Sequence, residues 1–366
     1  MNANDEQRAY RELYELLESS SFSGVVAMTH EGRSLIEFAG GLSNRQIGQA
    51  NRIDTRFATA SVSKIFTATC LARLADAGLC GFEQPLIEIV PWLKAPFDLS
   101  ISLASLLSHR SGLGDYIDDE AELPFAGMDV ARLDCPRAFL PYLRQTPRGA
   151  AGGFSYSSAG FILLGLAIEE LTGKAFPEAM AHWVLEPAGL RSTGFPEVDV
   201  LSADPAVGYL PDGRSNAGHL PRVGGADGGI VTTVADLQRL FTRLRTGGFL
   251  SEAVRRFLWQ DLGQISALSS YGHGFYLTRV WDEQWPGHTG SDPGVSARVA
   301  FSLQSESSII ILCNCNGMAF RAFRLALDYL TRTKLAEQAD GGTAGSRPPS
   351  GNSPPPETPS SHALRG

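Results

Sequence analysis

The sequence predicts an α/β fold of the α+β type, in which helices flank an antiparallel β-sheet and an all-helical subdomain is inserted into the sheet subdomain. Two observations lead to this prediction. Strand-like segments occur near both ends of the 366-residue chain, and the long stretch between them has mainly helical patterns broken by Pro and Gly. Apolar residues make up 43% of the chain and charged residues 19%, a composition typical of a globular protein.

The first elements are a helix and a hairpin. Apolar side chains recur at three- and four-residue spacing over residues 6–19, which predicts an amphipathic helix. Two strand-like runs, residues 23–28 and 35–38, flank Glu31 and Gly32, and this arrangement is typical of a β-hairpin.

The later elements continue the same pattern. A helix rich in Ala and Leu follows Ser61, and we expect it to end near Gly78, a residue suited to the left-handed turn after a helix. The sequence then predicts three short strands and a last amphipathic helix, over residues 274–277, 296–301, 308–312 and 318–338.

We therefore expect one domain over residues 1–338. Its sheet subdomain would comprise about 1–75 and 255–338, and its helical insertion about 76–254. From residue 339 to 366 the chain has much Pro, Gly and Ser and almost no large apolar residue, so we expect a disordered tail.

The charge and composition exclude several classes of partner. The formal net charge is −8 and no run of Lys and Arg offers a phosphate-binding surface, so we expect no nucleic acid. No apolar run is long enough to span a bilayer, and the N-terminus lacks the pattern of a signal peptide; we expect no membrane association and a cytoplasmic location. The seven histidines show no metal-ligand spacing, so we expect no metal. The sequence leaves the oligomeric state open.

Ser61 and Lys64 form the first candidate catalytic pair. Residues three apart on a helix lie on the same face, within reach of each other's side chains. A serine hydroxyl needs a neighbouring base to act as a nucleophile, and a desolvated lysine can lose its proton and serve as that base. This spacing alone is also common in ordinary surface pairs.

Two further segments carry side chains suited to catalysis. Tyr156 precedes a predicted helix and could carry a proton, although an aromatic residue that anchors a loop has the same pattern. His288, Thr289, Gly290 and Ser291 lie in a Gly-rich turn that leads into a strand, where a backbone N–H of Ser291 could stabilise an oxyanion.

The order and spacing of these three motifs resemble the serine β-lactamase and penicillin-binding-protein superfamily. The resemblance is closest to the branch that holds class C β-lactamases, DD-carboxypeptidases, D-amino-acid amidases and esterases. Three motifs are related to the set known from penicillin-binding proteins: S-x-x-K, Y-S-x and H-T-G. Three more segments are similar to stretches of that branch: residues 106–113, 224–237 and 271–275.

The resemblance implies a role for each motif. Ser61 would be the nucleophile that forms an acyl-enzyme, and Lys64 and Tyr156 would share the transfer of its proton to the leaving group. The backbone N–H groups of Ser61 and Ser291 would form the oxyanion hole. Further substrate contacts would come from the positions held here by Ser158, His288, Thr289 and Gly290. The resemblance implies no metal and no cofactor.

Two departures from the superfamily's pattern bear on the substrate. Ser158 stands where Asn is usual. A short hydroxyl makes fewer hydrogen bonds to a substrate amide than an Asn side chain, which has both an NH₂ donor and a carbonyl acceptor. His288 stands where many β-lactamases have Lys, and a neutral imidazole holds a carboxylate less firmly than an ammonium does.

These departures favour hydrolysis of esters or small amides, including D-amino amides and peptide-like substrates. Three alternatives remain: acyl transfer or peptide cyclisation through the same acyl-enzyme, DD-peptidase or β-lactamase activity, and a catalytically silent binding protein. An α/β-hydrolase is excluded because the sequence contains no G-x-S-x-G motif.

Overall fold

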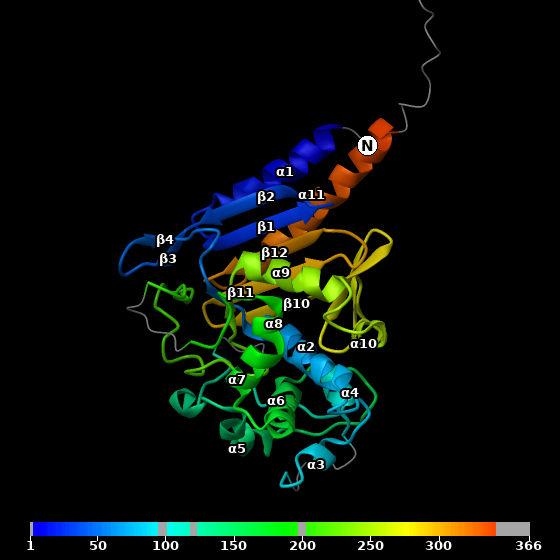
Figure 1. Cartoon of the computed structure of the whole chain (residues 1–366). Helices are drawn as coiled ribbons and strands as arrows, with labels where there is room; N and C mark the ends of the chain where they lie inside the picture. Colours follow the sequence, from blue (N-terminus) through cyan, green and yellow to red (C-terminus); the bar gives the residue numbers. More distant parts are fainter. Residues whose placement is uncertain (1–2, 94–100, 118–122, 197–202, 342–366) are drawn as a thin grey trace, which may run out of the picture.

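The computed structural model describes residues 3–93, 101–117, 123–196 and 203–341. A sheet with helices on both faces forms one half of the molecule, and a group of mostly short helices forms the other half (Figure 1). This arrangement confirms the predicted fold class. The sequence predicts a disordered tail over 339–366; residues 339–341 belong instead to the last helix, and the rest of the predicted tail lies outside the described residues.

The main sheet has eight strands in the order β2-β1-β12-β11-β10-β9-β8-β7, all paired antiparallel. Strands from the two ends of the chain meet as the second and third strands of the sheet, where Val26 of β1 lies opposite Ile311 of β12. The strands are β1 (Gly24–His30), β2 (Arg33–Gly40), β7 (Gln264–Ser266), β8 (Ser269–Tyr271), β9 (Tyr276–Val280), β10 (Glu283–Asp292), β11 (Val295–Phe301) and β12 (Ser308–Cys313).

The hairpin predicted at the N-terminus is β1 and β2. Glu31 and Gly32 form its turn with φ values of 48° and 78°, so both turn residues have the left-handed conformation that two-residue hairpin turns require.

The two faces of the sheet bury different clusters because side chains alternate along a strand. In β12, Ile309 and Ile311 pack on one face, whereas Ile310 and Leu312 pack on the other. The first face is covered by α1 (Ala3–Leu17) and α11 (Met318–Gly341), which lie side by side in Figure 1. These are the two terminal helices that the sequence predicts.

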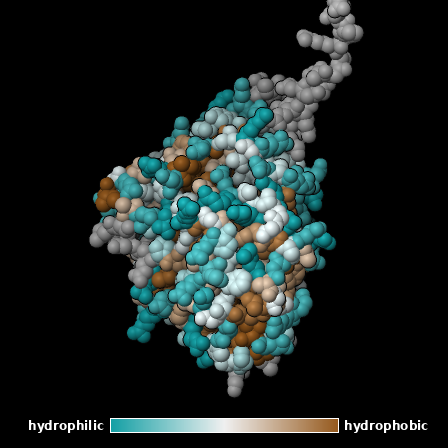
Figure 2. Space-filling model, viewed as in Figure 1, coloured by the Kyte–Doolittle hydropathy of each residue, from teal (hydrophilic) through white to brown (hydrophobic). Residues whose placement is uncertain are grey.

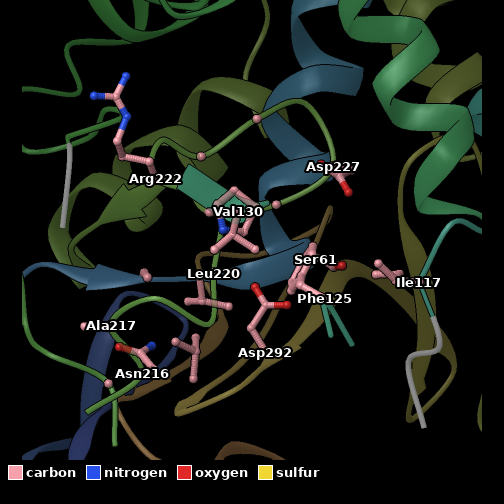
Figure 3. Close-up of a pocket in the computed structure, with 18 of the residues that line it drawn as sticks. Ser61, Ile117, Phe125, Val130, Asn216, Ala217, Leu220, Arg222, Asp227 and Asp292 are labelled. Carbon is pink, nitrogen blue, oxygen red and sulfur yellow. The ribbon is translucent and has the colours of Figure 1, made fainter. Parts of the chain in front are cut away.

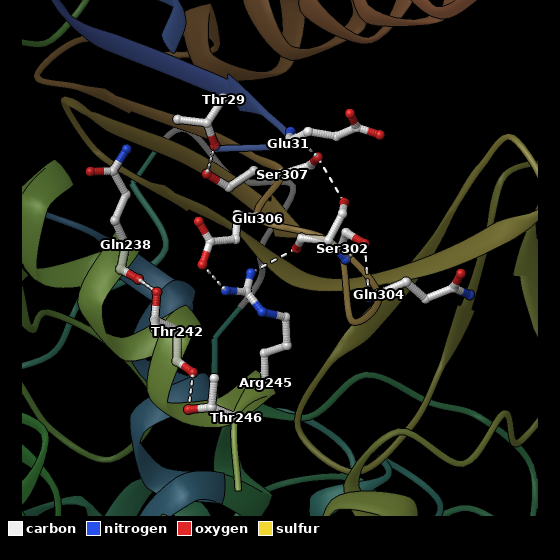
Figure 4. A network of polar contacts seen from close by, with 12 residues as sticks. Thr29, Glu31, Gln238, Thr242, Arg245, Thr246, Ser302, Gln304, Glu306 and Ser307 are labelled. Carbon is white, nitrogen blue, oxygen red and sulfur yellow. Dashed lines mark hydrogen bonds and ion pairs between the residues drawn. The ribbon is translucent and has the colours of Figure 1, made fainter. Parts of the chain in front are cut away.

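The second face is covered by α2 (Ser63–Asp76) and α9 (Val234–Arg245). Phe241 of α9 stacks on Phe301 of β11 with ring centroids 4.4 Å apart. Arg245 at the end of α9 pairs with Glu306 at 3.0 Å and donates to the Ser305 carbonyl at 2.7 Å, which ties α9 to the turn before β12 (Figure 4). The helix α2 ends just before Gly78, as predicted, and Gly78 has φ 73°.

The helical half surrounds α6 (Ser158–Thr172), which is buried over most of its length. The other helices are α3 (Leu86–Ile89), α4 (Leu103–Leu107), α5 (Leu140–Leu143), α7 (Phe176–Met180), α8 (Glu186–Ala188) and α10 (Glu252–Leu258), with short helical turns η1 (Ala60–Val62), η2 (Val130–Arg132), η3 (Pro136–Phe139) and η4 (Ala181–Leu185). Two small two-stranded sheets pair β3 (Leu42–Asn44) with β4 (Gln49–Ala50) and β5 (Phe57–Ala58) with β6 (Val231–Thr232).

The surface is mostly hydrophilic in the view of Figure 2, where apolar side chains also gather over the helical half. Among the described residues, none of the helices combines the length and the apolar character that crossing a bilayer requires.

Candidate active site

Ser61 lies in η1, at the junction of the sheet and the helical half. Its segment is held by the strand pair β5–β6 and by Thr59, whose N–H and hydroxyl both donate to the Ile230 carbonyl at 3.0 Å. Ser63 fixes the same turn, because its hydroxyl donates to the Ala60 carbonyl at 2.7 Å and accepts from the Ile230 N–H at 2.9 Å. The Ser63 hydroxyl is therefore engaged in hydrogen bonds to the backbone, so of these two serines Ser61 is the one whose hydroxyl faces Lys64.

The backbone just before Ser61 has an unusual conformation. Ala60 has φ 47°, in the left-handed region that residues other than Gly seldom adopt. Conformations of this kind persist where the surrounding contacts determine them, and they are frequent at catalytic sites.

Lys64 lies one turn after Ser61, in α2, and its side chain is 0% exposed. Its ammonium nitrogen Nζ is 2.9 Å from the Ser61 Oγ, 3.2 Å from the Ser158 Oγ and 2.7 Å from the Asp227 carbonyl oxygen. These three oxygens match the three N–H groups of an ammonium. The structure thus brings together Ser61, Lys64 and Ser158, three of the residues that the sequence singled out.

Tyr156 lies beside this group, half-buried on the loop before α6. The Lys64 Nζ is 5.1 Å from the centroid of the Tyr156 ring, within the range of a cation–π contact. The other side of the tyrosine is packed by His109, with ring centroids 4.3 Å apart. Tyr156 therefore lies next to the lysine that the resemblance pairs it with.

The end of β10 runs directly past η1. A Cβ added to Gly290 would lie 2.1 Å from the Thr59 carbonyl oxygen, so this strand reaches η1 only because residue 290 has no side chain. Ser291, the next residue, is exposed, and Asp292 is half-buried. The close approach explains in physical terms why Gly follows Thr289 in this motif.

His288 is buried, unlike a residue that contacts substrate at the surface of a site. Its side chain is 1% exposed, and its Nδ1 donates to the Thr289 carbonyl at 2.6 Å. Its Nε2 is therefore the unprotonated nitrogen, and it accepts from the Tyr271 hydroxyl at 3.2 Å. Tyr271 in turn lies 3.0 Å from the Nε2 of His109, whose Nδ1 accepts from the Ser157 N–H at 3.1 Å.

Both histidines are neutral at pH 7. Burial, together with a smaller effect of the nearby Lys64, lowers the pKa of His288 to about 3. Burial also lowers the pKa of His109 well below its ordinary value, with added effects from Lys64 and His288. This part of the site consequently presents no cation to a substrate carboxylate.

Two carboxylates belong to the site although sequence reasoning did not select them. Asp115 accepts from the N–H groups of Ser158 and Ala159 at 2.5 and 3.1 Å, so it caps the N-terminus of α6 and holds Ser158 toward Lys64. Asp227 accepts from the Tyr116 hydroxyl at 2.7 Å. Asp227 lies in the segment 224–237 whose similarity to the superfamily was recognised, and that similarity was the signal that could have found it.

The pKa of Asp227 reflects opposing influences. Burial raises it, whereas Lys64 and the hydrogen bond from Tyr116 lower it.

A cavity of about 260 Å³ opens beside Ser61 (Figure 3). Ser158, Asp227 and Asp292 contribute to its wall, together with mostly apolar side chains from 125–139 and 216–229. In the parts of the chain that the structure describes, no three His, Cys, Asp or Glu side chains lie close enough together to hold a metal ion. The arrangement is thus a half-buried serine beside a fully buried lysine, at the edge of a small pocket.

With this geometry established, comparison with known proteins defines the class. Residues 10–332 match the family described as Beta-lactamase, so the chain belongs to that family and is a serine hydrolase. The predicted resemblance to β-lactamases and penicillin-binding proteins is confirmed.

Several known proteins are similar over most of the chain. Penicillin-binding protein 4 of Amycolatopsis lactamdurans is 28% identical over 355 residues, which cover 88% of this chain and 86% of the relative. The crystal structure of a penicillin binding protein from Bacillus halodurans has 30% identity and a TM-score of 0.77, and the match covers 88% of this chain and 99% of that one. The D-amino acid amidase of Ochrobactrum anthropi SV3, complexed with D-phenylalanine, shares the fold with a TM-score of 0.73 and 20% identity, over 91% and 99% of the two chains.

Proposed function

We propose that this serine hydrolase cleaves esters or small amides through an acyl-enzyme on Ser61. The observation that carries the proposal is the contact of 2.9 Å between the Lys64 Nζ and the Ser61 Oγ, in a position where the lysine is fully buried. In its neutral amine form, Lys64 would accept the Ser61 proton across this contact.

The chemistry then follows in two steps. In the first, the Ser61 Oγ bonds to the acyl carbon, its proton passes to Lys64 or Tyr156, and the same groups protonate the leaving alcohol or amine as its bond to the acyl carbon breaks. In the second, water bonds to the acyl carbon and gives up a proton to the same groups; the bond between the acyl carbon and the Ser61 Oγ then breaks, the Oγ takes up that proton, and the acid is released. Backbone N–H groups of Ser61 and Ser291 would stabilise the oxyanion in both steps.

Two features support esters and small amides over substrates that need a carboxylate anchor. The neutral, buried His288 offers no charge to a carboxylate, and Ser158 offers a short hydroxyl where an Asn amide would reach further. The D-amino acid amidase that shares the fold is a relative that acts on small amides, which is consistent with this substrate range.

Intact-mass measurement after incubation with a fluorophosphonate and with short-chain 4-nitrophenyl esters tests the proposal. We expect a single covalent adduct on Ser61 and steady release of 4-nitrophenol. Ser61→Ala should abolish both, whereas the control Ser63→Ala should lower stability but keep an adduct. Ester turnover by folded Ser61→Ala would contradict the mechanism.

The cytoplasmic location remains a prediction, and fractionation of the native cells would test it.

A further inference from the structure

Two cysteines flank a bend at the end of β12. Cys313 is the last residue of this strand, and Cys315 follows after Asn314, where the chain bends. Side chains two positions apart along an extended segment point to the same side. Both cysteines pack against the face of the sheet that α1 and α11 cover, and both are free thiols. Cys313 is fully buried there, whereas Cys315 is half-buried.

The two sulfur atoms lie against the same short segment at the start of β1. The Cys315 Sγ is 3.5 Å from the Ser23 carbonyl oxygen. A Cβ added to Gly24, the next residue, would lie 2.9 Å from the Cys313 Sγ, so this sulfur occupies the space that a side chain at position 24 would take. The Cys313 thiol also forms a hydrogen bond with the Cys315 sulfur. The two thiols are therefore direct neighbours.

Asn314 fixes the bend that brings these thiols together. Its backbone N–H donates to the Ser23 carbonyl at 3.1 Å, and its Nδ2 donates to the carbonyls of Leu42 and Val207 at 2.9 and 2.8 Å. A disulfide requires two Cβ atoms about 4 Å apart, a separation that a fixed bend can maintain. Because hydrogen bonds from both the backbone and the side chain hold the intervening residue, the two sulfurs stay close to each other.

Cys315 is the more reactive of the two thiols. The hydrogen bond from Cys313 and the charge of Arg45 lower its pKa to about 7, although burial opposes them. An ordinary cysteine has a pKa of about 8.5, so Cys315 holds more of the nucleophilic thiolate at neutral pH. Burial raises the pKa of Cys313 well above its ordinary value, and this thiol keeps its proton. Peroxide preferentially oxidises accessible thiols of low pKa that lie beside a second cysteine.

We propose that Cys315 is a modification site for hydrogen peroxide, and that Cys313 converts the oxidised product into a disulfide between the two residues. This inference is independent of the substrate on which Ser61 acts.

The oxidation proceeds in two steps. In the first, the Cys315 thiolate bonds to one peroxide oxygen and the O–O bond breaks; the released hydroxide takes up the proton that the thiol had given to water, and Cys315 becomes a sulfenic acid. In the second, the Cys313 sulfur bonds to the Cys315 sulfur, the S–O bond breaks, and the hydroxide leaves as water with the Cys313 proton. Two thiols are thus oxidised to one disulfide while one peroxide is reduced to two molecules of water.

The test is a mass measurement on one peptide of the full chain. Trypsin cleaves after Arg298 and Arg321, so both cysteines lie in the peptide 299–321, which contains no other cysteine. The protein is treated with hydrogen peroxide at pH 7, and its remaining thiols are then alkylated with iodoacetamide under denaturing conditions. We expect this peptide to lose two hydrogens and take up no alkyl group. Dithiothreitol added before alkylation should restore two alkylation sites, and oxidation of Met318 is distinguished because it adds an oxygen.

Variants assign the two roles. Cys313→Ala should leave Cys315 as a sulfenic acid that dimedone traps, whereas Cys315→Ala should leave Cys313 reduced after the same treatment. Cys135→Ala, which removes an exposed cysteine elsewhere in the chain, should not change the yield of the disulfide. In the wild type, the rate of alkylation of Cys315 should reach half its maximum near pH 7, and in Cys313→Ala this midpoint should rise because the hydrogen bond is lost.

Three outcomes would overturn the proposal. The first is a wild-type peptide 299–321 that is doubly alkylated after peroxide treatment as it is before. The second is a disulfide that joins Cys315 to Cys80 or Cys135 instead of Cys313. The third is a wild-type alkylation midpoint at the ordinary value of about 8.5, which would show that Cys315 is not activated. The first two measurements need no variant, so they remain decisive even if Cys313→Ala fails to fold.

Discussion

The Tyr271 hydroxyl donates to the Nε2 of His288 at 3.2 Å, and the same oxygen accepts from the Nε2 of His109 at 3.0 Å. Backbone groups at both ends fix the two imidazole tautomers, since Ser157 donates to His109 and His288 donates to the Thr289 carbonyl. One phenol thus links the N-terminus of α6, which carries Ser158, to β10, which carries Ser291. The two walls of the site are held in register by this chain of hydrogen bonds.

Tyr271→Phe should weaken catalysis without removing any group that touches substrate. We expect kcat to fall about tenfold with KM nearly unchanged, because two buried imidazole nitrogens lose a partner and the walls lose their link, at a cost of about 1–3 kcal/mol. Steady-state kinetics on a short-chain ester and urea unfolding measure the two effects. The control Tyr142→Phe removes a half-buried hydroxyl that contacts the Asp129 N–H, and it should alter neither value appreciably. A parallel rise of KM in Tyr271→Phe would show that the link affects binding instead.

Gly290→Ala should disrupt the site more severely. The added Cβ would meet the Thr59 carbonyl oxygen, so β10 must move away from η1 and take the Ser291 N–H with it. Displacements on this scale cost on the order of 100-fold in rate. Single-turnover acylation by a 4-nitrophenyl ester measures this step. The control Gly81→Ala places its Cβ in open space, and it should acylate like the wild type. Unchanged acylation in Gly290→Ala would mean that β10 supplies no group to the oxyanion.

Much of the fold and the nucleophile could be predicted because their signals are local. A serine and a lysine three residues apart lie on the same face of any helix. The run of apolar residues in β12 predicts a strand. Strand patterns near both ends of the chain predict one sheet, and in the structure the first and last strands, β1 and β12, pair within it.

The contacts that Asp227 makes with Tyr116 and Lys64 could not be predicted, because they join residues far apart in the sequence. Tyr116 and Asp227 are 111 positions apart, and Lys64 and Asp227 are 163 apart. Each reads in isolation as an ordinary loop residue, so their proximity follows only from the packing of α6 and segment 224–229 around α2. The burial of His288 could not be predicted either, because the Gly residues around it are typical of an exposed turn.

Ser158→Asn tests why this site departs from the usual pattern of the superfamily. Ser158 lies beside Ser61 in the cavity wall and accepts from Lys64, and an Asn carbonyl could keep that contact while its NH₂ group reaches toward a substrate. We expect kcat/KM for a 4-nitroanilide to rise relative to the matching ester. Ser158→Ala is the paired control, since it removes the acceptor and should lower both rates. If amide turnover does not rise in Ser158→Asn, residue 158 does not set the preference between esters and amides.

The buried histidines should make stability depend on pH in a defined direction. An unfolded histidine binds a proton below about pH 6.5, whereas His288, with its pKa lowered to about 3, remains neutral in the folded protein. The unfolded state therefore binds more protons between these values, and the free energy of unfolding falls as the pH falls, by up to about 1.4 kcal/mol per pH unit for each such histidine. His273, with its pKa lowered to about 4, contributes in the same sense down to that pH.

Urea unfolding at fixed pH values between 6.5 and 4 measures this slope. His288→Gln has no titrating group at this position, so its stability should be lower than that of the wild type at pH 7 but should decline less steeply with acid, by about 1.4 kcal/mol per pH unit. His182→Gln, a change at an exposed histidine, should retain the wild-type slope. Equal slopes in His288→Gln and the wild type would show that His288 is protonated in the folded protein, and the neutral site inferred for the end of β10 would then be wrong.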